Sequence, residues 1–311
     1  MTVAITYVSA IGSGLGDVVL CLPVRQKLIE ARKNVVLVTR SFRQEGISER
    51  IAGIKGEISE ELLSLNTDDS YINLRAHPLQ TDHTWGTPEF EAFFGGPSNM
   101  EQIVQRISAD FGIEFSYEEL SPLKFRKLEE LSNTVALIPG SDGFYKHWPH
   151  EYWMRLNSEI TGLGLKTVVL GKENESPPVS RLLKAGLPHL NSPGIAEAID
   201  IVSSCKMVVS VDTGLMHIAV NQGLPTIAFI HPINFHTRTA ANCINFRSQR
   251  FCPRECREKM FDLAPEQLQA KDYLSVEIKF ERQECKLPIE ENCMAKIKPE
   301  DVFDELKKLF S

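Results

Sequence analysis

The chain of 311 residues contains no run of apolar residues close to the ~20 that a membrane-spanning helix needs. Residues 1–8 carry no basic stretch of the kind that begins a secretory signal peptide. Positive charge is not in excess either, because the net charge is −7, and this argues against a nucleic-acid partner. From these absences we expect a cytoplasmic protein, with peripheral contact as its only route to a membrane.

Cysteine is also scarce, with seven residues in the whole chain, and internal repeats and low-complexity tracts are absent. In a reducing compartment these thiols are expected to be free or metal-bound rather than paired in disulfides. Apolar residues, in contrast, make up 42% of the chain, which is ordinary for a globular protein with a substantial core. The length is comfortable for two domains.

Predicted strands alternate with predicted helices along most of the chain. We expect strands at residues 3–8, 35–39, 71–74, 135–139, 167–170, 207–211 and 226–229. We expect helices at residues 17–32 (kinked at Pro23), 99–112, 152–160, 177–185, 195–204, 214–221 and from 299, and irregular chain at 241–295. Two such series predict an α/β protein of two doubly wound, Rossmann-like domains that face a cleft. The domains are expected at 1–128 and 129–298, with a linker at 124–130 and a C-terminal helix at 299–311.

The most informative segment is a buried strand that ends at Asp212 and turns into a helix through Thr213 and Gly214. The first N–H groups of such a helix lack internal partners, and the helix dipole favours an anion there. His217 is close enough along the helix to reach the same anion. This pattern favours a phosphate site. The alternative is an ordinary turn with Asp212 as a cap and His217 on the surface.

Three further strand ends carry polar groups. The first is a glycine-rich turn that places Asp17 at a helix start. An NAD-binding domain would have an acid at the end of the next strand, but this chain has Arg40 there, which disfavours NAD. The second offers the Ser141 hydroxyl and the Lys146 ammonium to a phosphate. The third offers Glu175 to ribose hydroxyls. Taken singly, each is also compatible with a solvated helix start or loop.

In this order the motifs resemble glycosyltransferase family 9, the ADP-heptose:lipopolysaccharide heptosyltransferases. The resemblance is carried by Gly16-Asp17 with Pro23 and Leu28, Pro139-Gly140-Ser141 with Lys146-His147-Trp148-Pro149, Gly171 with Glu175, and Asp212–Ala219 with Gly223 and Pro225. It implies a GT-B fold, with the acceptor bound mainly by the N-terminal domain and the nucleotide-sugar by the C-terminal one. It also implies inversion at the transferred sugar.

The family's functional residues transfer to this chain position by position. Asp17 becomes the general base, bordered by Gly14 and Gly16 in the glycine loop on the acceptor side, and Lys146 acts on the departing diphosphate. The implied nucleotide-sugar site consists of Ser141, Asp142, Lys146, Glu175, Pro193, Gly194, Asp212, Thr213, Gly214 and His217. The implied partners are an ADP-sugar donor and an acceptor glycan, lipid or protein.

Two further features bear on the chemistry. The chain has no Asp-X-Asp triplet, so a magnesium-bridged diphosphate is not indicated and no cofactor is required for the reaction. His231-Pro232-Ile233 stands where the family usually has Gly-Pro-Thr, which leaves the choice of sugar open. A GT-B epimerase or hydrolase, or a non-catalytic protein that binds nucleotide diphosphates, are the alternative functions.

Four of the seven cysteines, Cys252, Cys256, Cys285 and Cys293, fall in the segment expected to be irregular. Four thiolates are what a structural zinc or iron ion requires, and a metal would hold a segment that has few periodic apolar positions. Their irregular spacing is equally compatible with plain free thiols.

Overall fold

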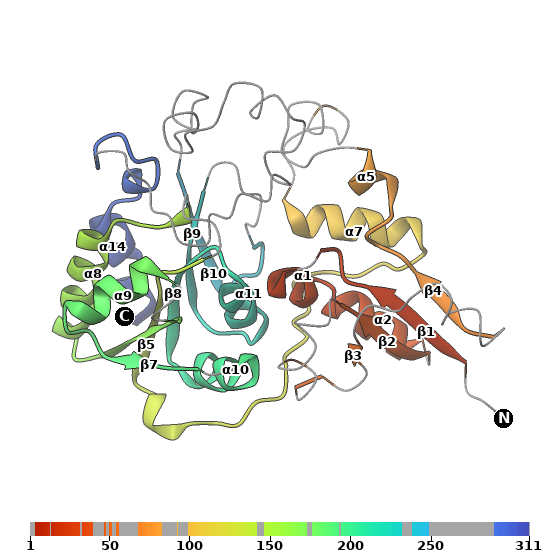
Figure 1. The fold of residues 1–311 in the computed structure, drawn as a ribbon, viewed down its shortest axis with the longest axis horizontal. Coiled ribbons are helices and arrows are strands. Elements are labelled where there is room, and N and C mark those ends of the chain that lie inside the picture. The colour runs from red at the N-terminus through yellow and green to blue at the C-terminus, as the bar shows by residue number, and fades with distance from the viewer. Residues whose placement is uncertain are drawn as a thin grey trace.

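The computed structural model describes residues 4–12, 14–31, 33–39, 47, 50–51, 54–55, 68–82, 92, 99–141, 146–172, 176–192, 194–231, 238–248 and 289–310. These residues form two parallel sheets, one in each half of the chain, with helices packed around them (Figure 1). The two-sheet α/β architecture predicted from the sequence is confirmed.

The first sheet has the order β3-β2-β1-β4. Its strands are β1 (Ile5–Ser9), β2 (Asn34–Val38), β3 (Ile54–Lys55) and β4 (Ser70–Ile72). The helices described in full in this half are α1 (Leu15–Leu20), α2 (Leu22–Glu30), α5 (Pro78–Thr81) and α7 (Met100–Asp110). The break between α1 and α2 falls at Cys21, two residues before Pro23, because proline is tolerated in the first turn of a helix but not within one.

The second sheet has the order β10-β9-β8-β5-β6-β7. Its strands are β5 (Thr134–Ile138), β6 (Lys166–Leu170), β7 (His189–Leu190), β8 (Met207–Val211), β9 (Thr226–Ile230) and β10 (Cys243–Arg247). Its α-helices are α8 (His150–Gly162), α9 (Pro177–Lys184), α10 (Ile195–Ser204), α11 (Gly214–Asn221) and α14 (Pro299–Phe310), with 3-10 turns η1 (Glu129–Leu131) and η3 (Met294–Lys296).

Each sheet reverses its strand order at one internal point. In the first sheet the reversal lies between β1 and β4, and in the second it lies between β5 and β8. Ligands of doubly wound folds bind outside the carboxyl ends of the strands at such points. The loops after β1, β5 and β8 therefore occupy the positions where this topology favours a ligand, and they carry the glycine loop, the Ser141–Lys146 loop and the Asp212 turn.

Helices α1 and α11 lie side by side between the two sheets (Figure 1). A Cβ atom on Gly16 would lie 2.7 Å from Cδ2 of His217, and a Cβ atom on Gly214 would lie 2.7 Å from Cβ of Leu15. Carbon atoms do not pack that closely, so each glycine makes room for a side chain of the opposite helix. The two helix starts that the sequence singled out are thereby brought together.

The chain between α7 and β5 reinforces this contact. The Tyr117 hydroxyl donates a hydrogen bond to the carbonyl of Leu20 at the end of α1 (2.7 Å). At the end of α11, the Asn221 amide donates to the Ser121 carbonyl (2.6 Å) and the Gln222 amide to the Leu123 carbonyl (3.0 Å). Both helices are thus attached to one connecting segment. The domain boundary expected at residues 128 and 129 stays a prediction.

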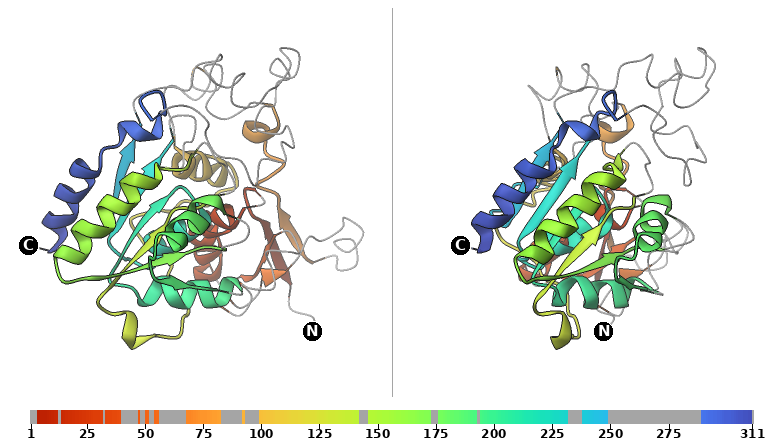
Figure 2. Two further views of the ribbon diagram at one scale, coloured as in Figure 1. Left: turned by 60° about the vertical axis from the view of Figure 1, so that its left-hand side comes forward. Right: turned by 90° about the vertical axis from the view of Figure 1, so that its left-hand side faces the viewer.

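The C-terminal helix α14 lies along α8 on one face of the second sheet (Figure 2). Trp148 packs against Trp153 and Phe229, and its indole N–H donates to the carbonyl of Ile297 just before α14 (2.9 Å). The Lys146–Pro149 loop is therefore anchored to the chain that leads into the last helix. Val302 and Leu306 of α14 are buried against this face, whereas Leu309 is 41% exposed.

The prediction of irregular chain at 241–295 is wrong for residues 243–247. Residues 243–247 form β10, which pairs in parallel with β9 along the edge of the second sheet. An edge strand is only half covered, so it lacks the continuous apolar run that identified the central strands. Within the described part of the chain, no helix combines the length and apolarity needed to cross a membrane.

Candidate functional site

One cavity of about 200 Å³ gathers the loops after β1, β5 and β8. It is lined by Gly14, Leu15, Gly16, Asp17, Ser141, Lys146, Asp212, Thr213, Gly214, Leu215 and His217. Residues of both halves of the chain, as far as 200 positions apart in the sequence, thus face a common space. Most of the described residues predicted for the site lie here.

The remaining predicted residues are placed elsewhere or not described. Gly194 caps the start of α10 and does not line this cavity. Asp142, Glu175 and Pro193 lie outside the described residues. The structure therefore places Asp17, the expected general base, and the residues expected near the diphosphate. The contacts expected with the ribose and the adenine stay predictions.

Asp17 stands in the first turn of α1 and is partly exposed toward the cavity. Its Oδ2 atom accepts a hydrogen bond from the backbone N–H of Gly14 (2.7 Å). This bond satisfies one of the orphan donors at the helix start and fixes the carboxylate relative to the glycine loop. The carboxylate is thereby held at the cavity wall without being buried.

The start of α11 forms the opposite wall. Thr213 occupies the N-cap position in an extended conformation, and its side chain makes no capping hydrogen bond. The first N–H groups of a helix have no intrahelical partners, and the dipole adds positive potential there. This wall of the cavity therefore favours a negatively charged ligand.

Lys146 and Asp212 form a buried ion pair at the N-terminal end of α11. The Lys146 Nζ atom lies 2.9 Å from Oδ2 of Asp212, and the two side chains are 13% and 1% exposed. The Asp212 N–H also bonds to the Phe229 carbonyl (3.1 Å), which keeps this residue in register with the sheet. Asp212 thus holds the Lys146 ammonium beside the cavity.

Two histidines close to Lys146 are neutral at physiological pH. Burial, together with the charge of Lys146, lowers the pKa of His147 to about 4 and that of His231 to about 3. A hydrogen bond with the Ser141 backbone opposes the shift for His147, and the charge of Asp212 opposes it for His231. Neither imidazole adds positive charge, so at this edge of the cavity the positive charge comes from Lys146.

His217 is 2% exposed, which rules out the alternative that it is an ordinary surface residue. Its Nε2 atom lies 3.6 Å from Oδ1 of Asp212, and its Nδ1 atom lies 3.3 Å from Nη1 of Arg238. Arg238 in turn pairs with Glu101 of α7. Neither Arg238 nor Glu101 was identified from the sequence. The available signal was an acid on the buried stripe of α7, which Glu101 shares with Val104.

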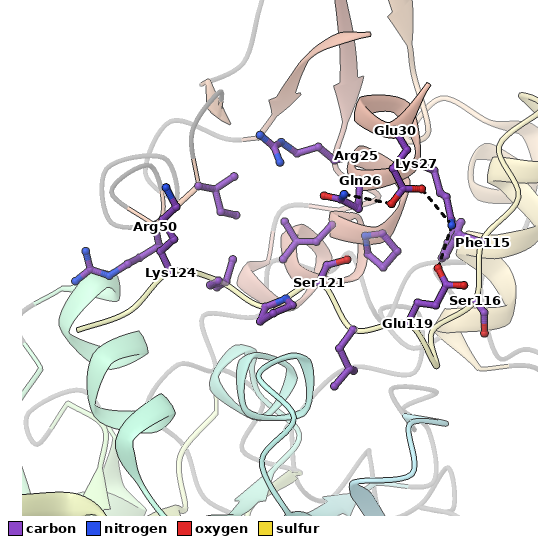
Figure 3. Close-up of a pocket in the computed structure, with 16 residues that line it drawn as sticks. Arg25, Gln26, Lys27, Glu30, Arg50, Phe115, Ser116, Glu119, Ser121 and Lys124 are labelled. Carbon is purple, nitrogen blue, oxygen red and sulfur yellow. Dashed lines mark hydrogen bonds and ion pairs between the residues drawn. The ribbon is translucent and has the colours of Figure 1, made fainter. Parts of the chain in front are cut away.

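A larger cavity of about 480 Å³ lies between α2 and the segment that connects the two halves (Figure 3). Two of its cations are paired with acids: Lys27 lies 3.3 Å from Glu30 and 3.0 Å from Glu119, and Arg50 lies 2.7 Å from Asp200. None of the predicted site residues is among the described residues that line it. We therefore place the candidate site in the smaller cavity.

The predicted metal ligands are largely untested. Cys252, Cys256 and Cys285 lie outside the described residues, and Cys293 is a half-buried residue at the start of η3. Among the described residues, no group of three or more His, Cys, Asp or Glu side chains is arranged to hold a metal ion. A zinc or iron site at these cysteines stays a prediction.

Comparisons with known proteins agree with this fold. The sequence model of glycosyltransferase family 9 (heptosyltransferase) matches residues 98–259, just over half of the chain. The lipooligosaccharide heptosyltransferase 2 of Haemophilus influenzae is 31% identical over 108 residues, which cover 32% of this chain and 31% of that protein. The match therefore spans about a third of the length of this curated relative.

Solved structures resemble the chain over nearly its whole length. A family 9 glycosyltransferase from Veillonella parvula has a TM-score of 0.64 at 17% identity and covers 98% of this chain and 97% of its own. The E. coli heptosyltransferase WaaC with ADP has a TM-score of 0.62 at 15% identity, with 98% and 99% covered. The iron-containing dodecameric glycosyltransferase TibC of enterotoxigenic E. coli has 0.59 at 11% identity, with 100% and 78% covered. These likenesses confirm the GT-B fold class.

Proposed function

Because the chain belongs to glycosyltransferase family 9, we propose that it transfers a heptose from an ADP-sugar to an acceptor hydroxyl, with inversion at the anomeric carbon. One observation carries the proposal. A carboxylate from the N-terminal half, Asp17, shares a cavity with a lysine and a helix start from the C-terminal half. The acceptor would be a glycan, a lipid or a protein.

In the proposed reaction Asp17 takes the proton of the acceptor hydroxyl as its oxygen attacks the anomeric carbon. The new carbon–oxygen bond forms on one face of the sugar while the bond to the diphosphate breaks on the other. A base on one side and anion stabilisation on the other match this requirement. The proton stays on Asp17 until it is lost to solvent, and ADP leaves with the electrons of the broken bond.

The departing diphosphate would be stabilised by the start of α11, by Lys146 and by the side chains of Thr213 and His217. A compact ammonium and a helix dipole both act on developing negative charge without reorganising during the step. The cavity of about 200 Å³ is smaller than most ligand pockets, and we assign it to the diphosphate and the adjoining sugar. The WaaC structure named with ADP supports ADP as the nucleotide.

The donor assignment predicts a nucleotide preference. A ligand that binds only the folded protein raises its melting temperature, so ADP and ADP-sugars should stabilise the protein more than UDP or GDP at equal concentration. A thermal-shift series over these nucleotides measures this directly. Equal or stronger stabilisation by UDP would show that the adenine assignment is wrong.

We also propose a structural zinc or iron ion held by Cys252, Cys256, Cys285 and Cys293. Two observations support this proposal. The TibC structure is described as iron-containing, and cysteine thiolates are common ligands of zinc and iron. We expect elemental analysis of untagged protein to find close to one metal equivalent, and chelation to lower stability before it affects ADP affinity. Less than about a tenth of an equivalent, with all four thiols titrating freely, would favour plain cysteines.

A further inference from the structure

Three buried residues connect the N-terminal half of the chain to the candidate diphosphate site. Glu101 of α7, Arg238 after β9 and His217 of α11 are 1%, 4% and 2% exposed. Nε of Arg238 pairs with Oε1 of Glu101, and Nη1 of Arg238 lies 3.3 Å from Nδ1 of His217. The three side chains form one continuous line from α7 to the cavity wall.

Glu101 has little freedom in this arrangement. Its Oε2 atom accepts hydrogen bonds from the backbone N–H of Thr239 (2.7 Å) and from the Thr239 hydroxyl (2.5 Å), while Oε1 accepts from Arg238. Both carboxylate oxygens are therefore used. Buried ionised groups are tolerated when they are paired and hydrogen-bonded in this way.

Arg238 is fixed from a second direction. Asn245 on β10 accepts a hydrogen bond from the Arg238 N–H (3.1 Å) and donates one to the Arg238 carbonyl (2.8 Å). The guanidinium also lies 5.7 Å from the ring centroid of Tyr117. Backbone and side chain are thus both held, and Nη1 of the guanidinium faces both Nδ1 of His217 (3.3 Å) and the His217 carbonyl (3.4 Å).

A guanidinium only donates hydrogen bonds, and it is charged at every physiological pH. The Nδ1 atom of His217 must therefore offer its lone pair to Arg238, which leaves the ring proton on Nε2. An imidazolium would oppose two N–H groups at this contact. The Nε2 atom faces Asp212, at 3.6 Å from its Oδ1 atom, and His217 lines the cavity.

We propose that Glu101 and Arg238 are positioning residues that hold His217 as its neutral Nε2–H tautomer, so that the ring can donate to an anionic group of the ligand. The effect on ligand binding rests on the proposed function, whereas the tautomer itself does not. Because Glu101 belongs to the N-terminal half, the donor site of the C-terminal half is complete only when the two halves are docked.

The tautomer is measured first on the unmodified protein. In ¹⁵N-histidine NMR at neutral pH, the resonance assigned to His217 by comparison with His217→Gln should have a protonated Nε2 and an unprotonated Nδ1. A protonated Nδ1, alone or in an imidazolium, would overturn the proposal. This result does not depend on any ligand, so it stands even if ADP fails to bind and the proposed function is wrong.

Two variants test the line of contacts. Arg238→Lys keeps the charge, but one ammonium cannot replace the fork that joins Glu101 to His217. Glu101→Gln keeps only one acceptor oxygen, so it cannot accept hydrogen bonds from both Arg238 and Thr239. Since hydrogen bonds to charged groups are involved, we expect the ADP dissociation constant to rise about tenfold in Arg238→Lys and less in Glu101→Gln. The His217 signals should become a mixture of tautomers in both variants.

Asp200→Asn is the matched control. Asp200 pairs with Arg50 of the N-terminal half in a partly buried contact (3.1 Å and 2.7 Å), and its described hydrogen bonds do not involve His217. This variant should lose folding stability. Its ADP dissociation constant and the population ratio of the two His217 tautomers should change less than about twofold. Equal losses of ADP affinity in Asp200→Asn and Arg238→Lys, or unchanged tautomers in the Glu101 and Arg238 variants, would reduce the line to a structural contact and overturn the proposal.

Discussion

Asp17→Asn is expected to lower the rate of the chemical step by about 10²- to 10⁴-fold while ADP affinity stays nearly unchanged. An amide cannot accept the acceptor's proton, but its oxygen can still accept the hydrogen bond from Gly14 that the carboxylate accepts at 2.7 Å. The helix cap and the glycine loop should therefore survive. Single-turnover rates with donor and acceptor, together with ADP titration calorimetry, separate the two effects.

Asp17→Ala distinguishes the base from the cap. Alanine removes both the proton acceptor and the hydrogen bond to Gly14, so this variant should also lose about 0.5–2 kcal/mol of folding stability. If the carboxylate acts as the base, the asparagine and alanine variants should be similarly slow, although only alanine is destabilised. Near-normal turnover of Asp17→Asn with its true acceptor would remove Asp17 from the mechanism.

The elements on either side of the Thr213-Gly214 turn could be predicted to the residue. Met207–Val211 and Gly214–Asn221 have the same bounds in the sequence analysis and in the structure. The strand is buried along its whole length and is apolar except at Ser210, and Thr213-Gly214 marks the change to a helix. Where burial and local turn chemistry agree, the pattern is unambiguous.

Elements at the sheet edges were harder to predict. β3 and β7 contain only two residues each, too few for any periodicity, and β10 is an edge strand with partly exposed residues. β10 nevertheless matters for the site, since its Asn245 holds the backbone of Arg238. The local pattern is weak at such positions even when the long-range contacts are specific.

The pairings between the site residues and their partners could not be predicted from local sequence. Glu101 and Arg238 are 137 positions apart, and both are charged residue types that usually lie on the protein surface. Lys146 and Asp212 were both expected at the cavity, but their pairing depends on β5 and β8 being neighbours in the sheet. Motifs identify the atoms that face a ligand, whereas the contacts that hold those atoms follow from topology.

That pairing determines what Lys146→Ala should do. The change removes a cation from the proposed diphosphate site and leaves the Asp212 carboxylate, 1% exposed, without the ammonium at 2.9 Å. Removing one member of a buried ion pair costs about 3–5 kcal/mol of folding stability, because the remaining charge is uncompensated. That carboxylate would also repel the diphosphate. We therefore expect ADP affinity to fall tenfold or more, at about 1.5–3 kcal/mol for a charge-assisted hydrogen bond.

The double variant Lys146→Ala/Asp212→Asn separates these two effects. Neutralising Asp212 should restore much of the lost stability, because no buried charge is left unpaired, but it cannot restore the cation that ADP contacts. Lys146→Arg should recover binding only in part, since a planar fork does not occupy the space of a compact ammonium. Chemical denaturation and ADP calorimetry on the unmodified protein, Lys146→Ala, Lys146→Arg and the double variant test these expectations. Full recovery of ADP affinity in the double variant would mean that Lys146 serves only to neutralise Asp212 and does not bind the diphosphate.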